Sequence, residues 1–323
     1  MTAAPSQQHP WSKARLAEAR SRSYRLLGRL YLRGLSTETL PVVRTIPALV
    51  QALPGDLDED ELAAAHQHLF GFNVFPFESL FLDSAGLLGG PVTMAVQGRY
   101  EQVGFVPAAD SASIDHVGLE LALLAFLAGA EADAWADGLT DTAQAIDARQ
   151  RTFLADHLLR WLAPLTVAVR AQEQPFYAAV ADLALDLALD QLDGPLPDFD
   201  LPAAPHLLED ERTGLKEIAT FLLTPPHSGV YLSRDDIGRL GRRQRLPRGF
   251  GDRRSMLLNL LRAAVTYERL PALLVDMQAL VSDWHSAYAT VPGADVWGRR
   301  AAATGAFLAE LTEQAQALAL TAE

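Results

Sequence analysis

The sequence predicts an all-α fold, and three observations lead to this prediction. Alanine and leucine dominate the chain, β-branched residues are sparse, and the apolar residues recur at helical spacing almost throughout. Hydrophobic residues make up 49% of the 323 residues and charged residues 21%, a balance typical of a globular chain. This length is enough for two ordinary domains with at least one sizeable core.

The first 190 residues contain the expected helices in close succession. The first spans residues 11–33 and carries an apolar stripe made of Leu16, Tyr24, Leu27 and Tyr31. Further helices are expected at 57–71, 91–103, 114–130, 139–171 and 175–190. The stripe of the long 139–171 segment consists of Leu154, Leu158, Trp161 and Leu165. Pro164 is expected to kink this helix.

A proline-rich stretch then interrupts the helical pattern. Residues 191–206, QLDGPLPDFDLPAAPH, hold Gly194 and four prolines, which a helix does not accommodate. We expect a linker or an extended crossing strap here. It divides a first domain, residues 1–190, from a C-terminal helical region, residues 207–323. Helices in that region are expected at 207–223, 234–240, 253–270, 272–289 and 301–320.

Composition and missing motifs exclude several classes of function. The absence of cysteine removes disulfides, thiolate metal sites and thiol catalysis. The chain has no Walker loop, no His-Glu-x-x-His helix and no Gly-x-Ser-x-Gly elbow, and GLLGG at 86–90 is too short for a dinucleotide fingerprint. We therefore expect a protein that is not an enzyme and that holds no cofactor.

Charge and hydropathy bear on partners and location. A formal net charge of −13 argues against a general nucleic-acid binder and suits a basic partner. No apolar run reaches the length of a membrane span, and the first residues, MTAAPSQQHPWSK, lack the apolar core of a secretory signal. The sequence thus predicts a cytoplasmic protein.

The histidines are weak candidates for a metal site. His66 and His68 are two residues apart and point to different sides of a helix, so we predict no metal site there. His157 and Trp161 are one turn apart, which fits either the edge of a site or ordinary core packing.

An arginine-rich segment, residues 234–254, has two interpretations. It holds eight arginines against three aspartates, an excess of five positive charges in an acidic chain. One interpretation is a patch that contacts phosphates and makes the protein a nucleic-acid-binding regulator. The other is a pair of helix ends, in which Ser233-x-x-Asp236 is a capping box, Arg239, Arg242 and Arg243 lie near a C-terminus, and Asp252 caps the next helix.

The stretch FNVFPFESLFLD, residues 72–83, concentrates aromatic side chains without any regular period. A core helix or strand would show a spacing. The segment is therefore expected to be a loop, broken by Pro76, that either packs onto the body or holds another molecule.

Three stretches in fixed order resemble a known family. They are LFGFNVFPFESLFLD ending at Asp83, SIDHVGLELALLAFLAG from Ser113, and FLADHLLRWLAPLTVAVRAQEQPFYAAVADLA from Phe153. Together they resemble the TorD/DmsD family, the maturation chaperones of molybdenum-cofactor oxidoreductases. The matching positions are Pro76, Phe77, Ser79, Phe81 and Asp83, then Asp115 and His116, then His157, Leu158, Trp161, Pro175, Phe176 and Tyr177.

The resemblance covers roughly residues 11–190 and has departures. Phe77 and Phe81 stand where the family often has Trp or Tyr, and Ser113-Ile114 precedes the Asp-His pair where an acidic residue or proline is common. Beyond this range, TPPHSGVYLSRDDI from Thr224 resembles a stretch of longer relatives.

The resemblance implies a TorD/DmsD-like helical bundle, followed here by a second, smaller helical region. It implies binding of the twin-arginine signal peptide of a molybdopterin oxidoreductase precursor before export, by a monomer or a domain-swapped dimer. A receptor for such a peptide needs an apolar groove with carboxylates near one end. Phe75, Phe77, Phe81 and Leu82 would line the groove, and Asp83, Asp115 and Glu120 would meet the arginines. The candidate peptide-binding residues are Pro76, Phe77, Ser79, Phe81, Asp83, Asp115, His116 and Glu120.

Other interpretations stay open. His116 and Glu120 are four residues apart and share one helix face. The aromatic residues, above all Phe72 and Phe75, would alternatively plug the helix bundle. A nucleic-acid-binding regulator that uses residues 234–254 is the first rival function. A hydrolase or haem protein built on His116 or His157 is the second.

Overall fold

The computed structural model describes residues 12–55, 57–108, 112–196, 198–209, 212–247 and 249–321. Within these ranges the regular structure is helical and no strand occurs, so the predicted all-α fold is confirmed. Residues 1–11, which include Trp11 of the first predicted helix and most of the stretch inspected for a secretory signal, lie outside the described part. No helix in the described part has the length and hydropathy that a membrane crossing requires.

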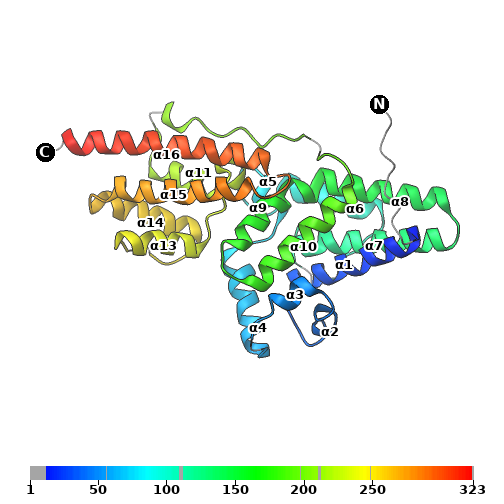
Figure 1. The fold of residues 1–323 in the computed structure, drawn as a ribbon. Helices are drawn as coiled ribbons and strands as arrows, with labels where there is room; N and C mark the ends of the chain where they lie inside the picture. The colour runs from blue at the N-terminus through cyan, green and yellow to red at the C-terminus, as the bar shows by residue number, and fades with distance from the viewer. Residues whose placement is uncertain are drawn as a thin grey trace, which may run out of the picture.

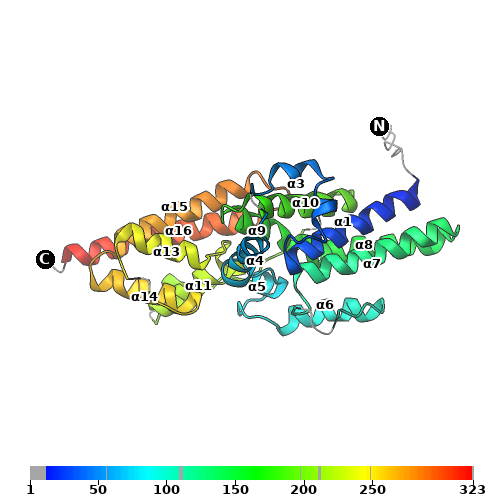
Figure 2. The same cartoon turned by 90° about the horizontal axis from the view of Figure 1, so that it is seen from below.

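The N-terminal bundle is built from five long helices. They are α1 (Lys13–Arg33), α7 (Val117–Ala136), α8 (Thr140–Phe153), α9 (Leu159–Arg170) and α10 (Pro175–Leu192). Helix α1 packs along α7, α8 folds back on α7, and α9 pairs with α10 (Figures 1 and 2). The α1–α7 crossing is close because glycines meet there: a Cβ on Gly28 would lie 2.8 Å from the carbonyl oxygen of Gly118.

Shorter elements surround this bundle. They are α2 (Leu40–Val43), α3 (Pro47–Gln51), α4 (Glu59–His66), a π-helical segment (Gln67–Asn73), α5 (Glu78–Leu82) and α6 (Gly90–Gln102). Helix α6 lies at the periphery of the bundle, below α7 and α8 in the view of Figure 2. The predicted loop at 72–83 is therefore the end of the π segment, an extended stretch around Pro76, and the short helix α5.

The predicted helix at 139–171 is irregular in its middle. A π-helical segment, Leu154–Leu158, separates α8 from α9, and Pro164 lies inside α9. Proline has no N–H, so the carbonyl of Arg160, four residues earlier, lacks its helical donor. The indole Nε1 of Trp297 donates to that carbonyl at 2.9 Å. Trp297, in the last helix, thus supplies the hydrogen-bond donor that Pro164 lacks.

The C-terminal region is a second group of helices. After a 3-10 turn (Leu207–Glu209) come α11 (Leu215–Leu223), α12 (Pro225–Ser228), α13 (Arg234–Gln244), α14 (Arg253–Thr266), α15 (Leu270–Tyr288) and α16 (Asp295–Thr321). Helices α15 and α16 run side by side, with α13 and α14 below them in Figure 1. Helix α16 begins six residues earlier than predicted, and α15 begins at Leu270 because Pro271 suits the first turn of a helix.

Residues 193–206 form an extended strap from α10 towards α11, with Pro197 outside the described part (Figure 1). The strap is held along its length. Leu201 is buried, the ring of Phe199 lies under the guanidinium of Arg160 at 5.2 Å, and Arg300 donates to the carbonyl of Pro202 at 2.9 Å.

Aromatic side chains join the two groups of helices. Phe81 of α5 is fully buried and stacks on Tyr231 at 5.3 Å between ring centroids. The rings of Trp161 and Trp297 lie at 5.4 and 6.5 Å from it. Arg253 sits over the Tyr231 ring at 4.4 Å and donates to the carbonyl of Leu232 at 3.0 Å. A buried aromatic cluster therefore lies where the predicted boundary separates the chain.

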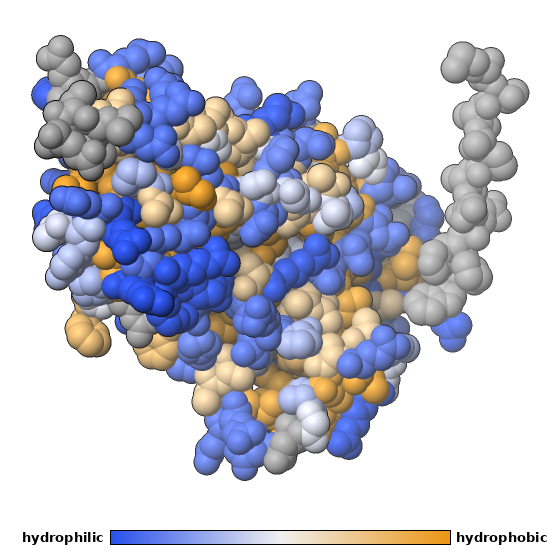
Figure 3. All heavy atoms as spheres, turned by 60° about the vertical axis from the view of Figure 1, so that its left-hand side comes forward, coloured by the Kyte–Doolittle hydropathy of each residue, from blue (hydrophilic) through white to orange (hydrophobic). Residues whose placement is uncertain are grey.

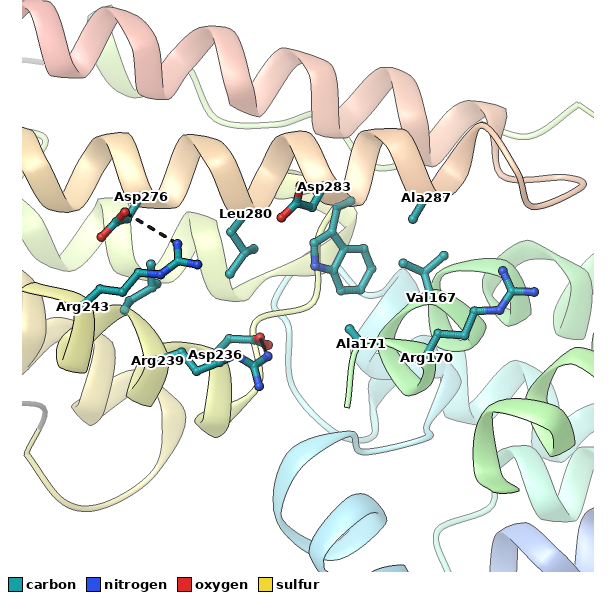
Figure 4. A pocket seen from close by; sticks show the side chains of 12 residues that line it. Val167, Arg170, Ala171, Asp236, Arg239, Arg243, Asp276, Leu280, Asp283 and Ala287 are labelled. Atoms are coloured by element: carbon teal, nitrogen blue, oxygen red, sulfur yellow. Dashed lines mark hydrogen bonds and ion pairs between the residues drawn. The ribbon is translucent and has the colours of Figure 1, made fainter. Parts of the chain in front are cut away.

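A cavity of about 410 Å³ lies at the same junction, between the end of α9 and helices α13 and α15 (Figure 4). Arg243 of α13 pairs with Asp276 of α15 at 3.7 Å, and Arg239 pairs with Asp236. The first pair links α13 to α15, and the second lies within α13. Seen from the C-terminal side, the surface carries a broad hydrophilic area in which apolar side chains are scattered among the polar ones (Figure 3).

Candidate functional site

The aromatic loop, residues 72–83, and the Asp-His segment, residues 113–117, meet through their backbones. Phe77 and His116 form an antiparallel bridge. The N–H of Glu78 donates to the carbonyl of Asp115, and the N–H of Val117 donates to the carbonyl of Pro76, each at 2.9 Å. Two motifs nearly forty residues apart in the sequence are thus joined at the start of α7.

Asp115 holds the start of α5. Its side chain is fully buried, and its Oδ2 accepts from the N–H of Ser79 at 2.9 Å while its Oδ1 accepts from the Ser113 hydroxyl at 2.9 Å. A free N–H in the first turn of a helix is what a capping carboxylate satisfies. Asp115 caps a helix distant in the sequence and not the one that follows it.

His116 caps α7 itself. Its Nδ1 accepts from the N–H of Gly118 at 3.0 Å, and its ring meets the ring of Phe77 edge-on at 5.0 Å. Burial lowers the pKa of His116 to about 4, with the nearby His66 adding to the effect and Asp115 opposing it. The ring is therefore neutral at pH 7, in the tautomer whose proton is on Nε2.

Glu120, one turn further along α7, is fully buried and faces other polar groups. Burial and the negative charge of Glu78 raise the pKa of Glu120 well above its ordinary value, which favours the neutral acid. Glu78 is paired with His157, whose Nδ1 lies 3.1 and 3.2 Å from its two carboxylate oxygens. The indole of Trp161 also approaches Glu120 closely enough to affect its pKa. The carboxyl group of Glu78 and the indole of Trp161 thus lie beside Glu120, and within the described residues neither contact has regular hydrogen-bond geometry.

The structure brings some candidates together and separates others. The rings of Phe77 and His116 are in contact, and Asp115 accepts from the N–H of Ser79. Pro76 is buried next to Phe77. Phe81 instead faces Tyr231 and Trp297, in the aromatic cluster described above. Asp83 is half-buried after α5, where its Oδ1 accepts from the N–H of Ala85 at 2.7 Å. Peptide binding by this set stays a prediction.

Three further residues belong to this site by position: Glu78, His157 and Tyr100. Tyr100 of α6 donates to the carbonyl of Ile114 at 3.0 Å, and burial together with the charge of Glu120 raises its pKa well above the ordinary value. Sequence reasoning left Glu78 out. Its only signal was an acidic residue in an otherwise apolar loop.

The arginine-rich segment is built as the helix-end interpretation predicts. Ser233 and Asp236 form a capping box at the start of α13, and Asp252 accepts from the N–H of Ser255 at 2.8 Å at the start of α14. Arg242 and Arg243 lie in the last turn of α13. Several of the arginines contact the protein itself, as described for Arg239, Arg243 and Arg253.

The histidines at 66 and 68 serve local contacts. His66 Nε2 lies 2.9 Å from the carbonyl of Tyr31, and His68 Nε2 lies 3.0 Å from Asp235. Among the described residues, no group of three or more His, Asp or Glu side chains is arranged to hold a metal ion.

The comparison with known families matches this part of the molecule. Residues 39–167 match the nitrate reductase delta subunit family. The predicted resemblance to TorD/DmsD-like redox-enzyme maturation chaperones is thereby confirmed over this range. All eight candidate residues fall inside it, while the strap and the C-terminal helices fall outside. No curated protein matches the chain.

This family consists of chaperones for molybdoenzyme maturation and not of catalytic subunits. Residues 39–167 thus resemble the maturation chaperones of molybdoenzymes.

Proposed function

We propose that this protein is a cytoplasmic chaperone that binds the twin-arginine signal peptide of a molybdopterin oxidoreductase precursor and delays export until the cofactor is inserted. The observation that carries the proposal is the antiparallel bridge between Phe77 and His116. It brings together two of the three motifs on which the family resemblance rests. The family match supports the proposed role as a maturation chaperone.

The chemistry around the bridge suits such a peptide. A twin-arginine signal presents two guanidinium groups followed by an apolar run, and this chain carries a net charge of −13. Carboxyl groups at the start of α7 offer bidentate acceptors for guanidinium. The ring of Phe77 and the exposed Leu87 and Leu88 offer apolar surface nearby in the chain. Long-range attraction would act mainly on the association rate and weaken with salt.

The direct test is calorimetry with two synthetic peptides. One carries adjacent arginines followed by an apolar run, and the matched control carries two lysines in their place. We expect the arginine peptide to bind at least tenfold more tightly, because lysine lacks the planar fork of donors. An absence of binding to the signal peptides of all molybdoenzymes of the host would refute the proposal.

A double variant tests the Asp-His segment. Asp115→Asn with His116→Ala is expected to weaken peptide binding by about tenfold or more, which corresponds to roughly 1.4 kcal/mol. Both residues also cap helices, so a stability loss of about 1 kcal/mol or more is expected as well. Asp252→Ala is the matched control, since it removes a helix cap distant from the site. If the double variant binds within twofold of the wild type, the pair is structural.

A further inference from the structure

Glu78 and Glu120 form a buried carboxyl pair in the described core. Both side chains are buried, with residue exposures of 2% and 0%. Glu78 has His157 as its partner, whereas Glu120 has only Glu78 and the indole of Trp161 beside it, and within the described residues neither contact has regular hydrogen-bond geometry. Leaving a buried carboxyl group without a hydrogen bond costs free energy. Such a group is expected where a ligand completes its bonding.

The electrostatics of the pair favour a cation as that ligand. Asp115 and Tyr100 also face this region, and each of Glu78, Asp115 and Glu120 contributes to the raised pKa of Tyr100. Three buried carboxyl groups thus lie close enough to act on Tyr100, with the neutral His116 next to Asp115 and His157 paired with Glu78. A planar guanidinium has five donors and matches two carboxyl groups at once.

Helix α6 carries Tyr100 to these carboxyl groups and has few buried side chains. Of its side chains only Val96 and Tyr100 are buried, and Met94 is 72% exposed. A crevice of about 190 Å³ separates α6 from α7 and α8. Within the described residues its polar contacts with the rest of the chain include the Tyr100 hydroxyl to Ile114, an ion pair between Arg99 and Asp156 at 2.8 Å, and the N–H of the N-cap Gly89, which donates to the Ser79 hydroxyl at 3.3 Å.

Glycines in left-handed conformations flank α6 on both sides. Gly86, Gly89 and Gly90 have φ of 62°, 91° and 80° before it, and Gly104 has φ of 68° after it. Such positions absorb large backbone rotations with little steric cost. A helix with thin packing and glycine joints at both ends is able to swing as a unit.

We propose that Glu78 and Glu120 form a receptor for an arginine guanidinium, and that α6 is the gate that opens to admit it; the inference rests on the peptide binding proposed above. Opening moves Tyr100 away from the carboxyl groups. The guanidinium then pairs with the oxygens of Glu120 and bridges to Glu78. The apolar run of the peptide lies over the exposed side chains that precede and begin α6, namely Leu87, Leu88 and Met94.

The raised pKa of Glu120 adds a measurable consequence. A bound guanidinium favours the carboxylate, so the Glu120 proton leaves to solvent when the peptide binds. Calorimetry in buffers of different ionisation enthalpy should show release of up to about one proton per peptide at pH 7.

The gate is tested by locking it. The chain has no cysteine, so Arg99→Cys with Asp156→Cys introduces a unique thiol pair between α6 and the segment after α8. A short bis-alkylating reagent such as dibromobimane then ties the two. The matched control is Arg170→Cys with Asp182→Cys, which replaces a similarly exposed ion pair, at 2.7 Å, between α9 and α10. We expect the α6 lock to weaken binding of the arginine peptide at least tenfold and the control lock to change it less than twofold.

The carboxyl receptor is tested separately. Glu78→Gln and Glu120→Gln are expected to weaken binding tenfold or more, and Glu120→Gln should also abolish proton release. Glu131→Gln is the control: Glu131 is a buried glutamate on the same helix, with Trp135 and Gln150 donating to it at 3.0 and 2.8 Å. Circular dichroism and melting temperatures identify any variant that fails to fold.

The outcomes separate the two proposals. Equal binding by locked and unlocked protein overturns the gate and leaves signal-peptide binding intact. Unchanged binding in both glutamine variants overturns the receptor. If the unlocked protein binds no arginine peptide, the proposed function fails and this inference fails with it.

Discussion

Asp115 and His116 each have a structural task that is complete without any ligand. Asp115 satisfies the N–H of Ser79 on α5, and His116 satisfies the N–H of Gly118 on α7. The pair therefore fastens two helices together at the place where the aromatic loop meets the bundle. Sequence reasoning identified the pair but not its capping contacts, because the partner of Asp115 is 36 residues away.

At the residue scale, His116 should make stability depend on acid. Its folded-state pKa, about 4, lies below the ordinary value, so the neutral ring contributes stability above about pH 6.5. That contribution is lost as pH falls from about 6.5 through 4. In His116→Asn, which keeps a capping oxygen but does not titrate, this loss should be absent. Urea unfolding at pH 7 and pH 4.5 checks it, with a difference of up to roughly 3 kcal/mol expected between the two proteins.

Glu120 should produce the opposite dependence. Its pKa is raised in the folded state, so the stability associated with its proton is present at low pH and is lost as pH rises above the ordinary range of a glutamic acid. Glu120→Gln should therefore melt close to the wild type near pH 4 and above it at pH 8. If the melting temperatures of the two proteins change with pH in the same way, Glu120 does not titrate with the raised pKa that its burial predicts.

At the element scale, the long helices were predictable and the short ones were not. Helix α1 shows full turns of apolar periodicity, and the predicted ends of α1, α6 and α10 lie within two residues of those observed. Elements of four or five residues, such as α2, α3 and α5, are too short to show a period. The contacts that assemble the candidate site were also not predictable, because the bridge of Phe77 to His116 joins two segments that are distant in the sequence.

The α1–α7 crossing gives an element-scale prediction. Gly28→Ala should lower stability by about 1–3 kcal/mol, because its new Cβ would lie 2.8 Å from the backbone oxygen of Gly118. Gly98→Ala is the control. A Cβ on that glycine meets nothing within 4 Å, and alanine favours the helical state of α6 by up to about 1 kcal/mol. Thermal unfolding of both variants checks the contrast, and equal losses would contradict it.

At the scale of the whole molecule, the strap divides the chain while the aromatic cluster joins it. Exposed residues around Gly194 and Pro195 offer a protease access, whereas Leu201 is buried against the body. Phe81, Tyr231 and Trp297 bind the two helical groups through apolar contact that a nick in the strap leaves intact.

Limited proteolysis is therefore expected to cut first within residues 191–206. The two fragments should nevertheless elute together on gel filtration, because the aromatic cluster is not part of the strap. Mass spectrometry of the first products identifies the site. Earlier cleavage elsewhere would show that the predicted boundary is wrong.

The tie between Trp297 and the Arg160 carbonyl lends itself to a double-mutant cycle. Trp297→Phe removes the donor and should cost about 1–3 kcal/mol, because a buried carbonyl is left without a partner. In a Pro164→Ala background the amide of residue 164 supplies a helical donor, so the same substitution should cost less. Additive losses in chemical denaturation would mean that the carbonyl finds another partner.

The same tie has a consequence for the order of events during synthesis. The acceptor at Arg160 leaves the ribosome 137 residues before its donor at Trp297. At roughly 5–20 residues per second, the bundle waits on the order of 10 seconds for that donor. Throughout this interval the faces of Phe81 and Trp161 that the C-terminal helices later cover are open to whatever else is nearby. A nascent chain therefore displays an aromatic surface that the finished protein conceals.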